Sequence, residues 1–574
     1  MRIYILAGIV LFAFGWIVYN LIRINVFKYD LFRQKLDYYT TYVIYTNPPR
    51  ADILDRNNRK IAYNRQINRI VLHKSKYNTL TNQEKKYLKQ FLADNLQIYD
   101  LESLISGSYV ERLVLVKNPT YNEMCMVMEN MLYIYGVEVY TDYERVTVGP
   151  SVSFVTGYVN VPYKEEIEKD SSLRYYNDVG KSGLELQYDK ILRGQLGKIK
   201  YLMDPLGQPV KAIESIPPKK GSDLKTTLDS ELQQFTYALL KSLCDELSLR
   251  NDQPVAGSVI LMKTDGEILV LTSYPSFYTD TLKPDCNSVI SRYREFSCFY
   301  SRAISGEYPA ASTFKIITSV AALEEKLITK NTRIYCSGVF YVGSHPFHCF
   351  NTAGHGYLDI VDSLAVSCDV FYYVLGYKLG IEKIKKYSEL LGLNRPTGID
   401  LPFESGGLIP DKEWKRINWG EEWTSGDDVN ISIGQGMGLV TPLQMAVVVA
   451  TVATGYRPTP FLNLKSKPIL KKVDISPDTL RVVRLGLERV VDYGTASVIK
   501  TMVKGCKVAG KTGTAEVMPN ANNPKGLNNT WFVGYFGRIQ PEYVIVVSLE
   551  GSGGYGGQYA ATLAAKIINQ TCLK

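Results

Sequence analysis

The chain has 574 residues, of which 45% are hydrophobic and 21% are charged, and this ordinary globular composition excludes a disordered or collagen-like chain. At about 100–200 residues per domain, the length predicts about three to five folding units. The net charge of +9 is mild for this length, and the sequence has no long basic run and no DNA-recognition spacing, so we expect no nucleic-acid partner.

The first predicted element is a membrane anchor. Residues 3–19 carry no charge, and the apolar run continues to Ile22. About 20 such residues cross a bilayer as a helix, and Trp16 and Tyr19 stand where interfacial aromatic residues are common. A signal peptide and a buried core helix are the alternatives. The sequence has no small-x-small cleavage site after this run, and the run is N-terminal and uncharged, so we favour an anchor at residues 1–22.

Charge next to the anchor gives an ambiguous orientation. Only Arg2 precedes the span, and four basic residues follow it: Arg23, Lys28, Arg33 and Lys35. Counted literally, they place the large domain in the cytoplasm, but this rule weakens for long translocated domains.

Two larger domains are predicted after the anchor. Residues 23–215 mix short strand-like runs with charged loops rich in Asn and Tyr. Residues 213–225 then contain Pro-Pro, Lys-Lys and Gly-Ser, a composition typical of a domain boundary. We therefore expect one domain at 23–215 and another at 216–574.

The C-terminal domain is predicted to be α/β, with its sheet assembled from both ends of the domain. Apolar residues recur at helical spacing over 227–247, behind Asp229 as a candidate N-cap. Apolar runs on both sides of Asp265-Gly266 indicate a hairpin. The remaining candidates are strands at 507–517, 531–536 and 543–549 and a helix at 560–568. A long helical insert should separate the two parts of the sheet.

Ser312 and Lys315 are a candidate nucleophile and base. They form an S-x-x-K tetrapeptide at the start of a helical pattern, and residues i and i+3 share one face of a helix. The lysine amine can therefore reach the serine hydroxyl, provided that burial or a neighbouring cation lowers its pKa. Taken alone, this tetrapeptide also fits an N-cap serine beside an ordinary surface lysine.

Two further motifs make the catalytic interpretation much stronger. Ser367-Cys368-Asp369 precedes an aromatic helical run, and Lys511-Thr512-Gly513-Thr514 lies on the predicted strand at 507–517. S-x-x-K, S-x-[ND] and K-[TS]-G in this order are the signature of penicillin-recognising acyl-serine transferases. The second serine can relay a proton, and the K-T-G strand can bind an extended peptide. The amides of Ser312 and Thr514 can form an oxyanion hole.

With these motifs the sequence resembles a class B penicillin-binding protein of the elongation-specific branch, over nearly its whole length. PPRADILDRN at 48–57 and GKSGLELQYDKILRG at 180–194 resemble motifs of the family's N-terminal half, and TGIDLP at 397–402 and SIGQG at 432–436 resemble motifs of its C-terminal half. Ala51 and Asn58 replace usual glycines. Asp369 replaces the commoner asparagine, in a form familiar in the elongation-specific branch.

The resemblance implies a fold, an activity and partners. The fold would be a transpeptidase domain with a five-stranded antiparallel sheet flanked by helices, plus an elongated α+β pedestal. Ser312 would attack D-Ala-D-Ala stem peptides of peptidoglycan and pass the acyl group to an acceptor amine, and β-lactams would acylate the same serine. Lys315, Ser367, Asp369 and Lys511 would assist. Thr512, Gly513 and Thr514 would bind substrate.

The resemblance also implies where the protein acts and with what. Partners would be a SEDS-class glycosyltransferase and elongation-complex proteins. The catalytic domain would be periplasmic on a single-pass inner-membrane anchor, since the substrate lies outside that membrane. Catalysis would need no cofactor.

A separate cluster predicts a structural zinc site. Cys336, Cys349, His355 and Cys368 lie close together in the sequence, and three thiolates with one imidazole form a closed tetrahedral ligand set. A Cys336–Cys349 disulfide is the alternative in an oxidising compartment. The other six cysteines have no metal-like spacing, and no role is predicted for them.

Several other functions remain open. A soluble β-lactamase would need neither the anchor nor the long N-terminal region. A D,D-carboxypeptidase would use the same serine with water as the acceptor. A division-specific transpeptidase and a non-catalytic β-lactam-binding scaffold or sensor are further alternatives, although every catalytic side chain is retained.

Overall fold

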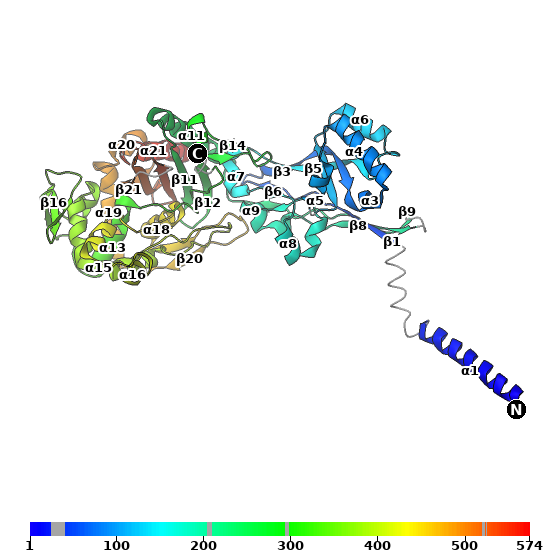
Figure 1. Cartoon of the computed structure of the whole chain (residues 1–574). Coiled ribbons are helices and arrows are strands. Elements are labelled where there is room, and N and C mark those ends of the chain that lie inside the picture. The colour runs from blue at the N-terminus through cyan, green and yellow to red at the C-terminus, as the bar shows by residue number, and fades with distance from the viewer. Residues whose placement is uncertain are drawn as a thin grey trace.

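The computed structural model describes residues 1–24, 41–108, 110–203, 209–292, 298–518, 523 and 525–573. Lys28, Arg33 and Lys35, which entered the charge count above, lie outside these residues. The folded body is elongated, with the N-terminal half at one end and the hairpin β16–β17 at the other (Figure 1).

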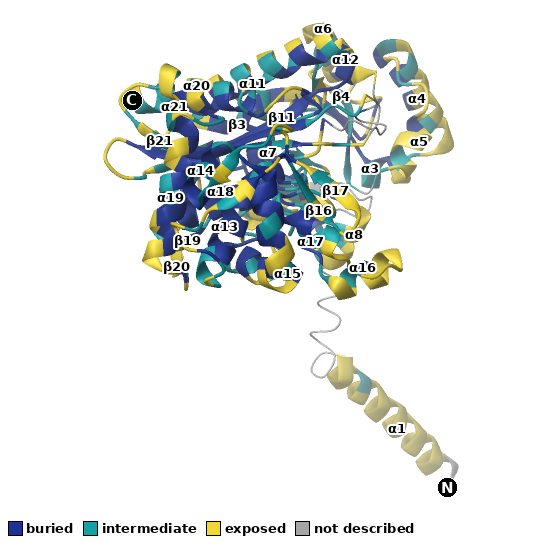
Figure 2. Cartoon of the chain, turned by 90° about the vertical axis from the view of Figure 1, so that its left-hand side faces the viewer, coloured by how far each residue is buried: buried dark blue, intermediate teal, exposed yellow. Residues whose placement is uncertain are grey.

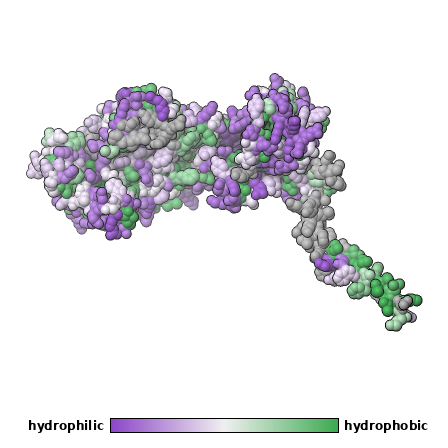
Figure 3. Space-filling model, in the orientation of Figure 1, coloured by the Kyte–Doolittle hydropathy of each residue, from purple (hydrophilic) through white to green (hydrophobic). Residues whose placement is uncertain are grey.

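The N-terminal helix α1 (Arg2–Ile22) stands apart from the folded body (Figure 1). Residues Ile3–Ile22 are long and apolar enough to cross a membrane, and none of this stretch is buried against the protein. Phe12 is 76% exposed and Trp16 60% exposed, and the helix is strongly hydrophobic on the face seen in Figure 3. Exposed apolar surface of this extent is costly in water, so α1 is a candidate single-pass anchor.

The N-terminal half is built on two sheets. In the larger one β3 pairs with β2, β4 and β5, and β2 pairs in parallel with β10. Helices α4 and α6 cover it and contribute to a core that includes Ile70, Leu92 and Val127. The strands are β2 (Ile53–Leu54), β3 (Lys60–His73), β4 (Arg112–Lys117), β5 (Val137–Thr147) and β10 (Leu224–Lys225). The helices are α3 (Lys74–Thr79), α4 (Asn82–Leu96), α5 (Leu101–Ser106) and α6 (Tyr121–Glu129).

The smaller sheet has the order β1-β8-β9 and is antiparallel. Its strands are β1 (Thr41–Thr46), β8 (Gly197–Met203) and β9 (Pro209–Ile216). The short elements between β5 and β8 are α7 (Ser153–Thr156), β6 (Val159–Asn160), α8 (Lys164–Lys169), β7 (Val179–Gly180), α9 (Gly183–Gln187) and α10 (Asp189–Leu192). This half is therefore mixed α and β.

The two family-like stretches of the N-terminal half, 48–57 and 180–194, meet in a buried ionic cluster. Arg50 donates to Glu185 at 2.5 Å and forms an ion pair with Asp189 at 2.8 Å. Arg145 reaches the second oxygen of Glu185 at 2.6 Å. Glu185 is 1% exposed, so these contacts replace the water that the carboxylate loses. Asn58, which stands where the family has glycine, has φ +64°, a left-handed conformation that asparagine tolerates.

The predicted sheet of the C-terminal half is confirmed. It is five-stranded and antiparallel, with the order β12-β11-β23-β22-β21, so strands from both ends of the domain lie together. The strands are β11 (Ala256–Lys263), β12 (Ile268–Tyr274), β21 (Lys507–Ala515), β22 (Asn529–Gly537) and β23 (Tyr543–Glu550). The predicted hairpin at Asp265-Gly266 is the β11–β12 connection.

Alternate residues of these strands face two separate cores, as the period of two in a strand requires. Val259 and Val547 pack on one side with α11 (Ser230–Asn251) and α21 (Ala560–Leu573). Ile260 and Val546 pack on the other side with α13 (Lys315–Glu324), α15 (Asp369–Leu391) and α18 (Pro442–Thr454). The sheet is thus buried on both faces (Figure 2). Asp229 caps α11 by accepting from the Leu232 amide at 3.0 Å, as predicted.

The insert between β12 and β21 is mostly helical, as predicted, but it also contains small two-stranded sheets. The main helices are α12 (Ser288–Ser291), α13 (Lys315–Glu324), α14 (Ile360–Ala365), α15 (Asp369–Leu391), α16 (Lys412–Trp419), α17 (Ser425–Ser432), α18 (Pro442–Thr454), α19 (Pro477–Asp492) and α20 (Ser497–Met502). The strand pairs are β13–β14 (Ser276–Phe277, Pro284–Asp285), β15–β18 (Ile334–Cys336, Gly356–Leu358), β16–β17 (Val339–Val342, His345–His348) and β19–β20 (Tyr456–Thr459, Ile469–Lys472).

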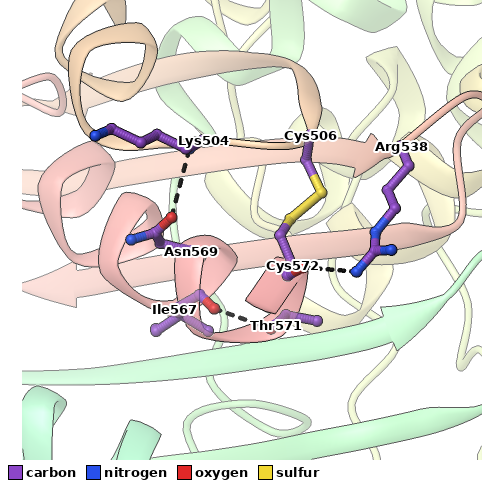
Figure 4. Close-up of a disulfide and its surroundings, with 7 residues drawn as sticks. All are labelled: Lys504, Cys506, Arg538, Ile567, Asn569, Thr571 and Cys572. Carbon is purple, nitrogen blue, oxygen red and sulfur yellow. Dashed lines mark hydrogen bonds between the residues drawn. A yellow bond between two sulfur atoms is a disulfide. The ribbon is translucent and has the colours of Figure 1, made fainter. Parts of the chain in front are cut away.

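Two contacts join parts of the chain that are distant in sequence: one links the two halves, and the other links α21 to the start of β21. The Tyr188 hydroxyl, in the N-terminal half, donates to Asp400 in the C-terminal half at 2.8 Å. A disulfide joins Cys506, which precedes β21, to Cys572 near the end of α21 (Figure 4). The sequence analysis assigned these two cysteines no role, and their separation of 66 residues shows no pattern that would pair them.

Candidate active site

Ser312 lies in a short 3-10 turn, η4 (Ala311–Phe314), that leads into α13. Ala311 has φ +51°, an uncommon conformation for a residue with a side chain. The turn is held by the Ala311 amide, which donates to the Gly434 carbonyl at 2.9 Å. A Cβ atom at Gly434 would lie 2.3 Å from the Ala311 carbonyl oxygen, so the glycine of the SIGQG stretch permits this contact. Ser312 itself is partly exposed and lines a cleft.

Lys315 is fully buried beneath this turn. Its ammonium group forms an ion pair with Asp369 at 2.7 Å and donates to the Ser367 carbonyl at 2.8 Å and the Ser367 hydroxyl at 3.2 Å. Among the described residues, its hydrogen bonds include none to Ser312. The hydrogen-bond acceptors of Lys315 thus belong to the second motif, Ser367-Cys368-Asp369. Asp369 also supplies a negative charge, which the commoner asparagine would lack.

Ser367 stands between two lysines. Its hydroxyl accepts from Lys511 at 2.8 Å as well as from Lys315, and its φ of +55° turns this residue out of the helical path before α15. Lys511 is fully buried, and its burial and the nearby charge of Lys315 hold its pKa well below the ordinary lysine range. The lowered pKa favours the neutral form of this amine, which lies next to a serine hydroxyl.

Asp369 connects these groups to the loop that follows β17. One carboxylate oxygen binds Lys315, and the other accepts from the Phe350 amide at 3.0 Å. Phe350 directly follows Cys349, so one carboxylate joins the lysine pair to the cysteine cluster described below.

The K-T-G residues lie on β21, the edge strand of the sheet. An edge strand has unpaired backbone groups that can bind an extended peptide. A Cβ atom on Gly513 would lie 3.1–3.2 Å from Thr313, Ala310 and Trp531, so this residue lets β21 approach the nucleophile turn closely. The Thr512 hydroxyl contacts that of Thr495 at 2.6 Å, and the Thr514 hydroxyl accepts from the Gly556 amide at 3.2 Å.

These groups border one cleft of about 1160 Å³. Its lining includes Ser312, Ser367, Asp369, Thr512 and Thr514 from the predicted set. It also includes residues to which the sequence analysis gave no role: His345, His348, Tyr373, Asn430, Gln435, Thr495, Glu516 and Tyr555. Asn430 and Gln435 flank or lie in the SIGQG stretch, which was the available signal; the others come from segments without a motif.

The four predicted metal ligands come together as one cluster. Their ligand atoms all lie within 4.8 Å of one another, and the three cysteines are buried. His355 Nδ1 lies 3.6 Å from the sulfur of Cys336 and 3.5 Å from that of Cys349. In a tetrahedral zinc site, Zn–S bonds of about 2.3 Å and Zn–N bonds of about 2.1 Å separate sulfur and nitrogen by about 3.6 Å. Cys336 and Cys349 are free thiols, so the alternative disulfide is not formed.

The cluster anchors the β16–β17 hairpin next to the cleft. Cys336 ends β15 and Cys349 follows β17, so two ligands flank the hairpin. The Tyr373 hydroxyl of α15 also donates to the His348 carbonyl at 3.1 Å. His345 and His348 line the cleft and are not members of the cysteine–histidine cluster.

Comparisons with known proteins identify the class. Residues 256–569 match the penicillin-binding protein transpeptidase domain, and residues 45–226 match the penicillin-binding protein dimerisation domain. The chain therefore belongs to the penicillin-binding protein family and is a transpeptidase of that family. The resemblance seen in the motifs is confirmed.

Three relatives illustrate the similarity. The chain is 27% identical to the peptidoglycan D,D-transpeptidase MrdA of Haemophilus influenzae, over 98% of this chain and 90% of the relative. It is 29% identical to the stage V sporulation protein D of Bacillus subtilis, over 91% of this chain and 78% of the relative. Among solved structures, the Helicobacter pylori penicillin-binding protein PBP2 in complex with MreC has a TM-score of 0.79 at 26% identity, covering 92% of this chain and 98% of that one.

Proposed function

We propose that this protein is a peptidoglycan D,D-transpeptidase that cross-links stem peptides during cell-wall elongation. The observation that carries this proposal is that Ser312 and Ser367 line one cleft beside a sheet edge strand, with the buried amines of Lys315 and Lys511 both hydrogen-bonded to Ser367. The relative from Haemophilus influenzae bears the same activity in its name.

The reaction would proceed through an acyl-enzyme. The Ser312 hydroxyl attacks the carbonyl carbon of the D-Ala-D-Ala bond, and the terminal D-alanine leaves. The amine of a second stem peptide then attacks the ester, forms the cross-link and restores Ser312. The backbone amides of Ser312 and Thr514 would stabilise the oxyanion in both steps. A β-lactam would acylate Ser312 in the first step.

Proton transfer would use the two lysines and the serine between them. Lys315, one helical turn from Ser312, is the base that the motif assigns. It forms an ion pair with Asp369 in this structure, and the pKa of the neighbouring Lys511 is lowered. The Ser367 hydroxyl touches both amines, so it can pass the proton from the nucleophile to the departing D-alanine amine.

Substrate would bind along β21. The donor peptide adds to the free edge of the sheet, and Gly513 lets it lie close to the nucleophile turn. The hydroxyls of Thr512 and Thr514 and the charge in the lysine pair would hold the peptide's terminal carboxylate.

The proposal includes a division of the chain and a location. Residues 1–22 would anchor it in the inner membrane, 23–215 would form a non-catalytic pedestal and 216–574 a periplasmic transpeptidase domain. The Cys506–Cys572 disulfide supports an oxidising compartment. Strand β10 (Leu224–Lys225) pairs with the sheet of the N-terminal half, so the sheet draws on residues beyond 215.

The proposed partners are a SEDS-class glycosyltransferase and other elongation proteins. Support comes from the solved complex of a similar Helicobacter pylori protein with MreC. The peptidoglycan substrate is assembled at the membrane, where α1 would retain the enzyme.

A structural zinc ion is the proposed occupant of the cysteine cluster. Cys336, Cys349 and Cys368 as thiolates and His355 as a neutral imidazole would hold it, and the ion would fix the loop that carries Ser367 and Asp369. Elemental analysis of protein purified without chelator should find about one zinc per chain, and Cys336→Ser should remove it. Wild-type protein without zinc would contradict this assignment.

The decisive experiment is covalent labelling with a fluorescent penicillin. Wild-type full-length protein in detergent should form a stable adduct on Ser312, mapped by peptide mass spectrometry, and Ser312→Ala should form none. Ser301→Ala is a matched control, because this serine precedes the motif and does not line the cleft. An unlabelled, folded wild type would favour a non-catalytic scaffold.

Elongation and division are separated by localisation. A fluorescent fusion of the elongation enzyme should lie along the side wall, and enrichment at the septum would instead indicate the division-specific alternative.

A further inference from the structure

Two cysteines outside the active site lie in direct contact. Cys286 directly follows β14, and Cys298 lies beyond residue 292 on the segment that leads to the nucleophile turn. Both are free thiols in this structure, and each thiol lies in hydrogen-bonding contact with the other. Cys244, by contrast, is buried with no thiol partner among the described residues, so contact between cysteines is not general in this chain.

The chain is held on both sides of this pair. On the Cys286 side, Asp285 accepts from the Tyr237 hydroxyl at 2.6 Å and from Lys241 at 3.0 Å. On the Cys298 side, the buried Arg302 binds Glu550 at 3.0 Å. Both cysteines therefore lie on segments that are fixed to the rest of the domain, one at Asp285 and the other at Arg302.

The two thiols differ in ways that suit oxidation in a set order. Cys286 is partly exposed, and its Sγ also lies 3.3 Å from the Ser291 hydroxyl. The pKa of Cys286 is lowered to about 6, chiefly by the hydrogen bond with Cys298 and further by the hydrogen bond with Ser291 and the charge of Lys241. Burial and the charge of Asp285 act in the opposite direction. Cys298 is 8% exposed, and its contact with Cys286 and its burial raise its pKa. Cys286 is thus the reactive thiolate and Cys298 the shielded partner.

We propose that Cys286 and Cys298 form a second disulfide bond in the mature protein. The proposal rests on the periplasmic placement proposed above, because an oxidising compartment preserves such bonds. The oxidant is the disulfide of a thiol–disulfide oxidoreductase. The Cys286 thiolate attacks one sulfur of that disulfide and displaces the other as a thiolate. Cys298, losing its proton, then attacks the Cys286 sulfur of the mixed disulfide. The oxidoreductase leaves as a dithiol, having gained the two electrons and two protons that the cysteines lose.

The disulfide would constrain the chain segment that leads to the turn carrying Ser312. After Cys298 the chain passes Arg302, and the Ala303 amide donates to Ser273 of β12 at 3.1 Å. The same segment then reaches Tyr308 and the turn that carries Ser312. The disulfide would thereby tie the β13–β14 pair to the segment that precedes the nucleophile.

Peptide mapping tests the proposal with an internal control. Full-length protein from the membrane of a bacterial host is alkylated with iodoacetamide without reductant, digested and analysed by mass spectrometry. We expect a cross-linked Cys286–Cys298 peptide beside the cross-linked Cys506–Cys572 peptide. If only Cys506–Cys572 is cross-linked and Cys286 and Cys298 are alkylated, the proposal is wrong. If all four are alkylated, the periplasmic placement fails, and the second disulfide with it.

A pair of variants provides a second measurement. Cys286→Ser should lower the thermal midpoint by several degrees relative to wild type in non-reducing buffer. The difference should vanish when both proteins are reduced. Cys125→Ser, which alters a cysteine of the N-terminal half, should leave the midpoint unchanged. Equal midpoints for Cys286→Ser and wild type without reductant would overturn the proposal.

Discussion

The two halves of this protein use buried charge for different purposes. In the N-terminal half Arg50 and Arg145 both bind Glu185 in a closed cluster, and this carboxylate residue is 1% exposed. In the C-terminal half Lys315 and Lys511 converge on Ser367, at the wall of an open cleft. Buried charges that neutralise one another are costly to separate, whereas two amines placed together beside a cleft perturb each other's pKa and are typical of a reactive site.

The difference teaches how to interpret motifs. Both halves contain stretches typical of the same family, and sequence alone gives them similar weight. Only the structure shows that the PPR and GLELQYD stretches form ion pairs with each other. The S-x-x-K, S-x-D and K-T-G motifs instead contribute residues to the lining of an open cleft.

The largest expected effect tests the reactive side. Lys315→Ala should lower the rate of acylation by a fluorescent penicillin by about 10²–10⁴-fold, because the base next to the nucleophile is lost. Lys412→Ala removes an exposed lysine that pairs with Glu382 and should acylate at the wild-type rate. A Lys315→Ala protein that is folded and acylates normally would remove this lysine from the mechanism.

The next effect tests the structural side. Glu185→Gln should lower the free energy of unfolding by about 3–5 kcal/mol, because the buried Arg145 loses its counter-charge and Arg50 keeps only Asp189. Glu185→Gln protein that has folded should still be acylated by fluorescent penicillin at the wild-type rate. Asp478→Asn, which removes an exposed ion pair with Arg481, is the control and should hardly change denaturant midpoints. Slower acylation in folded Glu185→Gln would show that the two halves are not separable in this way.

A pH profile sharpens the contrast. The pKa of Lys511 is lowered by burial and by the charge of Lys315, so its neutral form persists below the ordinary lysine range. As pH falls through that lowered pKa, Lys511 takes up a proton, and the acylation rate should fall by about tenfold per pH unit. Lys511→Arg should lose activity at every pH. A wild-type rate that rises as pH falls would contradict a role for the neutral amine.

The smallest effect concerns the contact between the halves. Tyr188→Phe removes the hydrogen bond to Asp400 and should cost about 1 kcal/mol of stability, measured by chemical denaturation. The loss is small because Asp400 keeps the amides of Leu462 and Asn463 at 2.7 and 2.9 Å. Tyr99→Phe, at an exposed position, is the matched control. A loss of several kcal/mol would show that this hydroxyl holds the halves together.

Much of the catalytic half was predictable because its signals are local. Strands β11 and β12 follow apolar runs with a turn between them, and Asp229 caps its helix through a contact three residues away. The order of three short motifs predicted which side chains would meet, and the four members of the cysteine–histidine cluster lie within one stretch of chain.

The remainder depends on tertiary contacts without a local signal. The partner of Lys315 is Asp369 and not Ser312, which follows from how α15 packs against α13. The sequence analysis gave no role to Arg145 and none to Glu185 beyond its family-like stretch, because their pairing needs a distant strand. The small hairpins of the insert are short strands whose pattern is hidden among helices. Cys506 and Cys572 meet only because α21 covers the sheet.

The Cys506–Cys572 bond closes a covalent ring around the last part of the chain. Strands β21, β22 and β23 and most of α21 lie inside it. Unfolding of α21 from the C-terminus therefore stops at Cys572, because this residue is covalently bound to Cys506, directly before the K-T-G strand. The proposed substrate-binding strand β21 therefore begins next to a covalent cross-link, which thermal motion does not break.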